Sequence, residues 1–304
     1  MFYFPGMGGK KSKPAPPPPL LNNPWRKINW GRDKHEALEY VNTYRPHNED
    51  LQLRILLHGP VGAGKSSFIN SVTSVLRQRM CNRATVGNVY EDCLTKQYKT
   101  YKIEKENGFY PFVFNDMMGM KYSSRRTRKI HVKDVKQALK GHVRDGVTFN
   151  PERKLLKEDR YYNRAPGLND RVHILVFIID ANTESLMKQE IVETIQDIRD
   201  EAIDLGIPQV SIFTKIDTVC PEIKQDVKNV YSSRRLQEKM EHFSAEVGIP
   251  LNGIFAVKNY HAETNLSDDT DTLILSVLRH IINYAGDFLS TREDQRPHRQ
   301  QSSM

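Results

Sequence analysis

Apolar residues recur along the chain in two alternating patterns. Short apolar runs predict six strands, over residues 53–57, 98–103, 111–114, 173–179, 210–213 and 254–257. Apolar residues at i, i+3 and i+4 spacing predict helices over residues 34–44, 66–79, 132–143, 184–205, 227–246 and 270–285. Three of the strands are near-continuous apolar runs, typical of strands buried on both faces. Strand followed by helix, repeated, predicts an α/β fold: a doubly wound, mostly parallel six-stranded sheet with helices on both faces.

Polar ends frame the region that carries this alternation. Residues 1–24 contain a lysine cluster and a proline-rich run and predict a disordered tail. Residues 290–304 are polar and predict a second disordered tail. Between the two tails we expect one domain over residues 25–289, in which residues 25–50 form an N-terminal extension that packs on the rest.

The composition is that of a soluble globular protein, with 27% charged and 38% hydrophobic residues in a chain of 304. The longest uncharged apolar stretch, residues 174–179, is far shorter than the roughly 20 residues of a bilayer-spanning helix, and residues 1–12 lack the apolar region of a signal peptide. Three cysteines without metal-ligand spacing disfavour a disulfide framework and a structural zinc site. We therefore expect a cytoplasmic protein without a membrane span.

Positive charge gathers in one segment, residues 121–171. It holds 15 Lys and Arg against 6 Asp and Glu, a net charge of +9, whereas the whole chain carries +8. The segment predicts either a solvated helical insertion or a surface for an anionic partner such as RNA, an anionic membrane or an acidic protein. No RNA-reading motif accompanies the charge, because Tyr161 and Tyr162 are its only clustered aromatic residues.

A phosphate-binding motif follows the first predicted strand. Residues 59–66 read GPVGAGKS and match G-x-x-x-x-G-K-[ST] between an apolar strand and an amphipathic helix. Glycines let main-chain N–H groups surround phosphate oxygens, and the helix presents its positive end to the same anion. Lys65 is expected to bridge the β- and γ-phosphates, and Ser66 to bind Mg²⁺. The candidate phosphate-binding residues of this loop are Gly59, Val61, Gly62, Ala63, Gly64, Lys65, Ser66 and Ser67.

Two further loops supply candidates for the metal ion and the γ-phosphate. The third predicted strand ends in the sequence NDMMG, which places Asp116 at the sheet edge where doubly wound folds bind ligands. Asp116 is expected to hold Mg²⁺ through water, and the Gly119 N–H to contact a γ-phosphate. Thr85 and Thr95 are both candidates for the switch threonine that completes Mg²⁺ coordination. We favour Thr95 because it lies directly before the second strand.

The sequence TKID after the fifth strand predicts recognition of guanine. A carboxylate at Asp217 can accept hydrogen bonds from the N1–H and the exocyclic amine of guanine, a donor pattern that adenine lacks. The aliphatic stem of Lys215 is expected to cover the base, with Thr214 beside it. Lys258, after the sixth strand, is a candidate for the opposite side of the base. Together these loops predict a GTP or GDP site with Mg²⁺.

These motifs, in this order, resemble those of a Ras-like P-loop GTPase domain. The sequences LKGHVRDG at residues 139–146, FNP at 149–151 and DRVH at 170–173 narrow the resemblance to the interferon-induced protein 44 family, over about residues 25–289. This resemblance implies a cytoplasmic guanine-nucleotide-binding protein that is induced by interferon and serves innate immune, antiviral defence. Longer members of that family carry a TLDc domain ahead of the GTPase-like part. Only the proline-rich tail precedes it here, so functions of the TLDc domain are not carried over.

Two positions predict slow hydrolysis of GTP. Met120 stands where Ras-like GTPases place the glutamine that orients the attacking water, and a thioether is a poor hydrogen-bonding group. Val61 stands where small GTPases usually have glycine, and its side chain would crowd an arginine finger supplied by a partner. We expect weak GTPase activity, raised by self-association across the nucleotide face as in related GTPases.

Two functions of different classes fit these observations. The first is a GTP-dependent conformational switch, whose basic segment 121–171 changes order with the γ-phosphate and engages an effector protein. The second is a non-hydrolysing binding or scaffold module that holds RNA, membrane or protein through the same segment, with the nucleotide as a structural ligand. An ATP-dependent kinase-like enzyme is disfavoured by Asp217.

Overall fold

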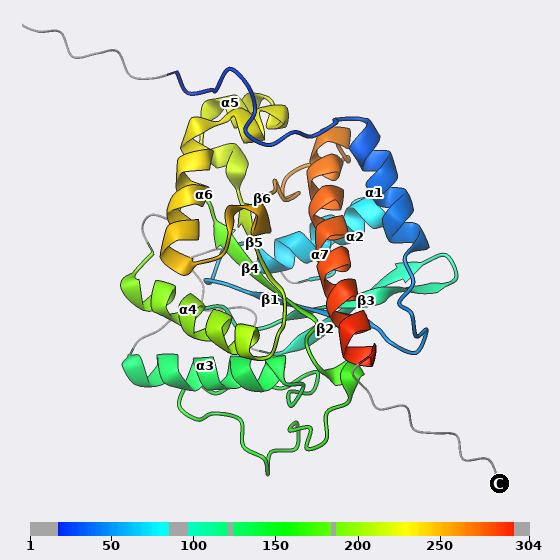
Figure 1. Cartoon of the computed structure of the whole chain (residues 1–304), viewed down its shortest axis with the longest axis vertical. Helices are drawn as coiled ribbons and strands as arrows, with labels where there is room; N and C mark the ends of the chain where they lie inside the picture. The colour runs from blue at the N-terminus through cyan, green and yellow to red at the C-terminus, as the bar shows by residue number, and fades with distance from the viewer. Residues whose placement is uncertain (1–17, 85–96, 121–123, 184–186, 295–304) are drawn as a thin grey trace, which may run out of the picture.

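The computed structural model describes residues 18–84, 97–120, 124–183 and 187–294. Its centre is a six-stranded sheet in the order β2-β3-β1-β4-β5-β6 (Figure 1). The strands are β1 Leu53–His58, β2 Lys99–Lys105, β3 Gly108–Asp116, β4 Ile174–Asp180, β5 Gln209–Thr214 and β6 Ile254–Ala256. Strands β3, β1, β4, β5 and β6 pair in parallel, and the edge strand β2 runs antiparallel to β3. The expected α/β fold with a mostly parallel sheet is confirmed.

Helices cover both faces of this sheet. One layer holds α1 Arg32–Thr43, α2 Lys65–Leu76 and α7 Asp268–Asp294, and the other holds α3 Arg125–Leu139, α4 Gln189–Asp204 and α6 Arg234–Val247. Strand β4 is apolar throughout because its alternate side chains point to opposite helix layers, and both layers are buried. Ile174, Val176 and Ile178 belong to the first layer, and Leu175, Phe177 and Ile179 to the second. Within the described ranges, no helix is long and apolar enough to cross a bilayer.

Helices α3, α4 and α6 begin at residues that the apolar pattern does not predict. Helix α4 begins at Gln189 instead of residue 184. Helix α3 begins at Arg125 instead of residue 132, because Ser124 and Thr127 form a reciprocal capping box. The segment predicted as one helix over 227–246 is divided into a 3₁₀ helix, η4 Val227–Ser232, and α6. The side chain of Ser233 caps α6 by accepting a hydrogen bond from the Leu236 N–H at 3.3 Å. A short helix that was not predicted, α5 Pro221–Gln225, precedes η4.

The limits of the folded region also differ from the sequence prediction. Residues 290–294, which the sequence places in the C-terminal tail, continue helix α7. Residues 18–24, placed in the N-terminal tail, contact the start of α6: the Leu21 N–H donates to the Ser232 carbonyl at 2.8 Å, and the Arg234 N–H donates to the Pro19 carbonyl at 3.1 Å. Residues 1–17 and 295–304 lie outside the described residues.

Arg26 fastens this N-terminal segment to the end of the sheet. Its guanidinium donates to the Leu251 carbonyl at 2.9 Å and to the Ile254 carbonyl at 2.8 Å. The same group lies over three aromatic rings, with distances of 5.0, 4.9 and 5.4 Å to the ring centroids of Trp25, Tyr231 and Phe255. The predicted packing of the N-terminal extension on the domain therefore has a specific anchor.

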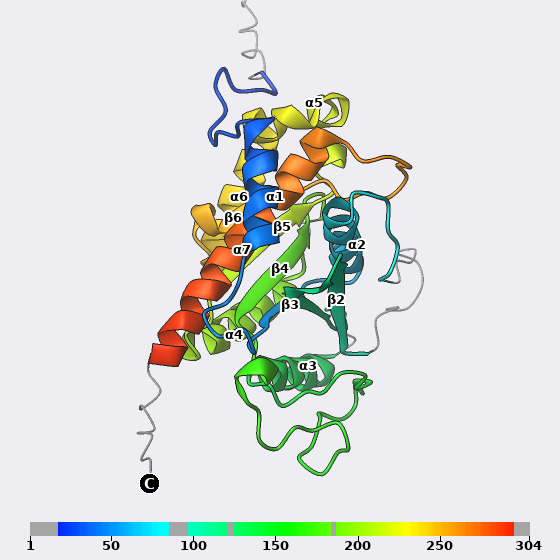
Figure 2. The ribbon, with the colours of Figure 1, turned by 90° about the vertical axis from the view of Figure 1, so that its right-hand side faces the viewer.

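The basic segment comprises α3 and a long loop that extends beyond it at one side of the molecule (Figures 1 and 2). Three of its cations pair with acidic residues of α4, because the two helices lie side by side. Arg128 pairs with Glu193 and Asp197, while Lys136 and Lys140 both pair with Glu201. Part of the excess positive charge is therefore neutralised within the fold.

Candidate nucleotide-binding site

The loop between β1 and α2 has a backbone that requires glycine. Gly59, Gly62 and Gly64 have φ values of 149°, 77° and 96°, a region that side chains disfavour. A Cβ atom on Gly59 would lie 2.1 Å from the carbonyl oxygen of Ile178 in the neighbouring strand β4. The loop can therefore pass this close to β4 only without a side chain at that position, which explains the first glycine of the motif.

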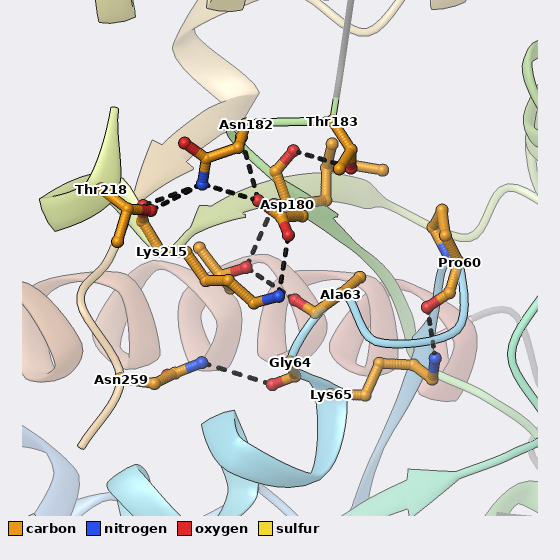
Figure 3. Close-up of polar contacts among 12 residues, drawn as sticks. Pro60, Ala63, Gly64, Lys65, Asp180, Asn182, Thr183, Lys215, Thr218 and Asn259 are labelled. Atoms are coloured by element: carbon orange, nitrogen blue, oxygen red, sulfur yellow. Dashed lines mark hydrogen bonds and ion pairs between the residues drawn. The ribbon is translucent and has the colours of Figure 1, made fainter. Parts of the chain in front are cut away.

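The start of helix α2 is built to receive an anion. No side chain of the described residues caps its first turn, so the N–H groups of Lys65, Ser66 and Ser67 lack the partners that a capping residue supplies. The Lys65 side chain folds back over the loop, and its ammonium donates to the Gly59 carbonyl at 3.1 Å. It also donates to the Pro60 carbonyl at 3.0 Å, as Figure 3 shows. These contacts hold the ammonium at the loop, where a phosphate group would meet it.

Ser66 and Asp116 form a polar pair at the mouth of this loop. The Ser66 hydroxyl donates to one oxygen of the Asp116 carboxylate at 2.8 Å. The other carboxylate oxygen, Oδ1, is buried and has no hydrogen-bond partner among the described residues. Burial raises the pKa of Asp116, while the Lys65 charge and the Ser66 hydrogen bond lower it. A buried carboxylate oxygen without a partner is unfavourable, and a cation beside the serine hydroxyl would relieve it.

The loop that contains Gly119 is paired with the phosphate loop. The Met120 N–H donates to the Gly59 carbonyl at 3.1 Å, and the Val61 N–H donates to the Met120 carbonyl at 3.3 Å. These bonds form a parallel bridge between Pro60 and Met120. A Cβ atom on Gly119 would lie 2.9 Å from the Lys65 ammonium nitrogen. Gly119 thus lies beside Lys65, and the Val61 N–H of the phosphate loop is already bonded to the Met120 carbonyl. The predicted contact of the Gly119 N–H with a γ-phosphate stays a prediction.

The loop after β5 brings the predicted guanine-binding residues to the same edge of the sheet. Thr214 is fully buried, and its hydroxyl lies 2.6 Å from the Ala63 carbonyl oxygen and 3.2 Å from that of Ile179. Its hydrogen bond therefore joins this loop to the phosphate loop. Asp217 is half-buried in the 3₁₀ helix η3 Ile216–Thr218, and among the described residues no group bonds to its carboxylate.

Sequence reasoning missed a polar cluster that positions Lys215. The backbone of Lys215 is left-handed, with φ of 55°, and its ammonium pairs with Asp180 Oδ2 at 2.8 Å. The other oxygen of Asp180 accepts hydrogen bonds from the main-chain and side-chain N–H groups of Asn182, at 2.9 and 3.0 Å. Asn182 also donates to the Thr218 hydroxyl at 2.6 Å (Figure 3). The sequence could have predicted this cluster, because Asp180 ends a buried apolar strand and Asn182 follows it, at the edge of the sheet where such folds bind ligands.

One residue after β6 contacts the phosphate loop, and its neighbour pairs with a nearby carboxylate. The Asn259 side chain donates to the Gly64 carbonyl at 3.3 Å, and it was not predicted as a site residue. The Lys258 ammonium pairs with Glu263 at 2.8 Å. Burial raises the pKa of Glu263, but the hydrogen bond from Lys258 and main-chain N–H groups outweigh it and hold that pKa at about 2. Lys258 is thus engaged with Glu263, and its predicted contact with the base stays a prediction.

The structure brings the predicted residues of four separate loops to the carboxyl edge of the parallel strands. The phosphate loop, Asp116 with Gly119, the TKID loop and Lys258 each follow a different strand. Thr85 and Thr95 lie outside the described residues. In the described part of the chain, no group of three or more His, Cys, Asp or Glu side chains could hold a metal ion.

Comparison with known proteins decides the family. The sequence model of the family described as 50S ribosome-binding GTPase matches residues 54–215, just over half of the chain. The chain belongs to this GTPase family. The matched region contains the phosphate loop and the Asp116–Gly119 loop and ends at Lys215, within the TKID loop. Asp217 and Lys258 lie beyond the matched residues.

Curated relatives resemble this GTPase over most of its length. Interferon-induced protein 44 of Mus musculus is 34% identical over 83% of the chain, and interferon-induced protein 44-like of Homo sapiens is 31% identical over 87%. The chain spans 59% and 58% of these two relatives, respectively. The resemblance to the interferon-induced protein 44 family is therefore confirmed.

Solved structures resemble the GTPase more distantly. A dimerization-deficient mutant of Toc33 from Arabidopsis thaliana aligns with 84% of this chain and 91% of its own, with a TM-score of 0.49 and 12% identity. This likeness is too weak to support a conclusion about function.

Proposed function

We propose that this GTPase binds GTP and GDP together with Mg²⁺, hydrolyses GTP slowly and acts as a conformational switch in the interferon-induced antiviral response. The observation that carries the proposal is the loop around Lys65. Its three glycines have positive φ values, helix α2 begins directly after it without a side-chain cap among the described residues, and the buried Lys65 ammonium folds back onto it. Such an arrangement binds a phosphate group. The role in the interferon response is drawn from the names of the relatives.

Ser66 and Asp116 are the residues that would hold Mg²⁺. The buried, unpartnered Oδ1 of Asp116 and the adjacent serine hydroxyl suit a hard cation that prefers oxygen ligands. When bound, Mg²⁺ would neutralise the charge of the β- and γ-phosphate oxygens. Lys65 would add a second positive charge to the same oxygens. Thr95 is proposed as a further ligand on sequence grounds alone.

Slow hydrolysis is proposed because the chain offers little to orient a water molecule. Met120 occupies the position of the usual glutamine, and its side chain is 3% exposed, with its main chain bonded to the phosphate loop. Among the described residues of this loop pair, the side chains of Val61 and Met120 are both apolar. We also propose, from the sequence and the resemblance, a cytoplasmic location and self-association across the nucleotide face.

Titration with four nucleotides tests the proposal. Fluorescent GTP, GDP, XTP and ATP are titrated in Mg²⁺ buffer against the wild type, Lys65→Ala and Asp217→Asn. Lys65→Ala should abolish binding. Asp217→Asn should shift preference from guanine to xanthine, because the amide donates a hydrogen bond to the xanthine carbonyl. Lys102→Ala, at an exposed lysine of β2, is the matched control and should bind GTP as the wild type does. Equal affinity of the wild type for ATP and GTP would refute base recognition.

A second candidate is the binding or scaffold module. Arg125, Lys129 and Lys133 lie on one exposed stripe of α3, at i, i+4 and i+8, and no ion pair to another described residue neutralises them. Binding of a nucleic-acid or lipid phosphate to this stripe should weaken steeply with ionic strength, and its affinity should be the same with GTP and with GDP bound. A switch should instead change partner affinity between GTP and GDP at constant salt.

A further inference from the structure

A cavity of about 360 Å³ lies at the opposite end of the sheet from the phosphate loop. Val172 and His173 line it just before β4, and Ile207 lines it just before β5, so it opens at the amino ends of the parallel strands. Nucleotide-site loops instead follow the carboxyl ends. The other apolar lining residues come from α3, the 3₁₀ helix η1 Leu168–Asp170 and the loop before it, the residue that follows α4, and α7. They are Leu139, Leu168, Pro166, Leu205 and Phe288.

Two sequence segments that the nucleotide site does not use converge on this cavity. Residues 139–146 contribute Leu139, Lys140 and His142, and residues 170–173 contribute Arg171, Val172 and His173. The two segments are joined by a hydrogen bond from the Val172 N–H to the Leu139 carbonyl at 3.2 Å. Both segments also carried the resemblance to the interferon-induced protein 44 family, and no role in nucleotide chemistry accounts for them.

The polar groups inside the cavity are already satisfied by the chain. His173 Nδ1 accepts from the Arg54 N–H at 2.9 Å, and His173 Nε2 lies 3.0 Å from the Leu168 carbonyl oxygen. Burial lowers the pKa of His173 to about 4, so the ring is neutral at physiological pH. The Leu205 carbonyl accepts a hydrogen bond from Arg292. The lining therefore offers apolar contact and no row of main-chain groups with which a peptide strand could pair.

The rim of the cavity is positively charged. Lys140, Arg171 and Arg292 line it. Lys140 is compensated by Glu201 at 2.5 Å, and Arg292 lies 5.2 Å from the Phe288 ring centroid. Arg171 is exposed, and within the described residues no carboxylate pairs with it. A ligand that places an anionic group at Arg171 and an apolar body below it would complement both features.

We propose that this cavity binds a single-chain amphiphile with an anionic head group, of the fatty carboxylate class. Its chain would lie against Leu139, Val172 and Ile207, and its carboxylate would face Arg171. The cavity is at the small end of the range of about 300–1,000 Å³ found for small-molecule sites, which favours one chain over a two-chain lipid. The inference is independent of the proposed switch, because the two sites occupy opposite ends of the strands.

Calorimetric titration of the full chain with dodecanoate, below its micelle concentration, tests this inference. We expect saturable binding with one site per chain. Dodecyltrimethylammonium, which has an alkyl chain of nearly the same length and a cationic head, should bind at least about fivefold more weakly, because its head meets Arg171 as a like charge. Absence of saturable dodecanoate binding, or equal affinity for the two amphiphiles, would overturn the proposal.

Variants separate the cavity from general surface charge. Arg171→Glu should weaken dodecanoate binding by at least about fivefold. Arg144→Glu changes an exposed cation of the same basic segment that does not line the cavity, and it should leave the affinity unchanged. Leu205→Trp enlarges a half-buried lining residue and should weaken binding about tenfold or more. Guanine-nucleotide binding by each variant reports an intact fold. Equal losses in Arg171→Glu and Arg144→Glu would refute the assignment of the cavity.

Discussion

Replacing Gly119 with alanine would weaken the pairing between the Gly119 loop and the phosphate loop. The added Cβ would lie 2.9 Å from both the Lys65 ammonium nitrogen and the Val61 nitrogen, and 3.0 Å from the Val61 Cα. Gly119 has no left-handed backbone requirement, so the alanine itself is not strained. The added Cβ therefore destabilises the state in which the two loops are paired. The Gly119 loop must move away from the phosphate loop by a few tenths of an ångström.

The size of the effect follows from the two hydrogen bonds that hold the pair. They measure 3.1 and 3.3 Å, so a small displacement brings both to the limit of hydrogen bonding. Each main-chain bond contributes about 0.5–1.5 kcal/mol net, and the pair about 1–3 kcal/mol, which is a factor of about 5 to 150 in an equilibrium constant. Under the proposed function, a γ-phosphate bound beside Lys65 would displace this pairing, whereas GDP has no group at that position. Gly119→Ala should thus raise affinity for a non-hydrolysable GTP analogue relative to GDP by about fivefold or more.

Fluorescent GDP and the fluorescent GTP analogue, titrated in parallel, measure this ratio directly. Gly167→Ala is the matched control, because Gly167 also lacks a left-handed backbone and an added Cβ there meets only the end of the Asp170 side chain, at 3.7 Å. Its ratio should equal that of the wild type. If Gly119→Ala leaves the ratio unchanged, or shifts it towards GDP, the pairing does not oppose the γ-phosphate and the reasoning is wrong.

Three further predictions concern stability. Thr214→Val leaves the buried Ala63 carbonyl without its donor and should lower the free energy of unfolding by about 1–3 kcal/mol in urea titrations, whereas Thr214→Ser should preserve it. Gly59→Ala should lower the free energy of unfolding by more than about 4 kcal/mol in the same assay. The control Gly108→Ala should lower it by about 1–2 kcal/mol, because an added Cβ there meets nothing within 4 Å. Equal losses of stability in the two variants would contradict the close approach of Gly59 to β4. Burial lowers the pKa of His131 from 6.5 to about 4, so the folded chain resists a proton that the unfolded chain takes up. The contribution of His131 to stability should be full above about pH 6.5 and fall by on the order of 3 kcal/mol towards pH 4. In urea titrations at both pH values, His131→Asn should remove this part of the fall, while His58 and His173, whose pKa values burial also lowers, keep theirs.

The sheet and the phosphate loop were predictable because their causes are local in sequence. A strand buried on both faces must be apolar throughout, and β4 shows this directly. The glycines and the lysine of the phosphate loop stand within eight consecutive residues, and the strand and helix on either side fix their geometry. Periodicity therefore sufficed to place the loop at the ligand-binding edge of the fold.

The parts that the sequence did not predict depend on polar residues or on distant contacts. Helix α3 buries His131 and Asp134 on the face turned to the core, so an apolar pattern underestimates its length. Asp180 and Lys215 are 35 residues apart and meet only because β4 and β5 are neighbours in the sheet. The pairing of Met120 with Gly59 also joins two loops after neighbouring strands, which no local motif specifies.

The contacts of the Arg26 guanidinium have a practical consequence for the design of shortened chains. A planar guanidinium can donate to the Leu251 and Ile254 carbonyls while its face lies over aromatic rings, which a lysine ammonium cannot do. Fragments made for crystallisation or cell complementation should therefore retain this arginine and the tryptophan before it. A fragment that begins after Arg26 would increase the solvent exposure of the Tyr231 and Phe255 rings and favour aggregation.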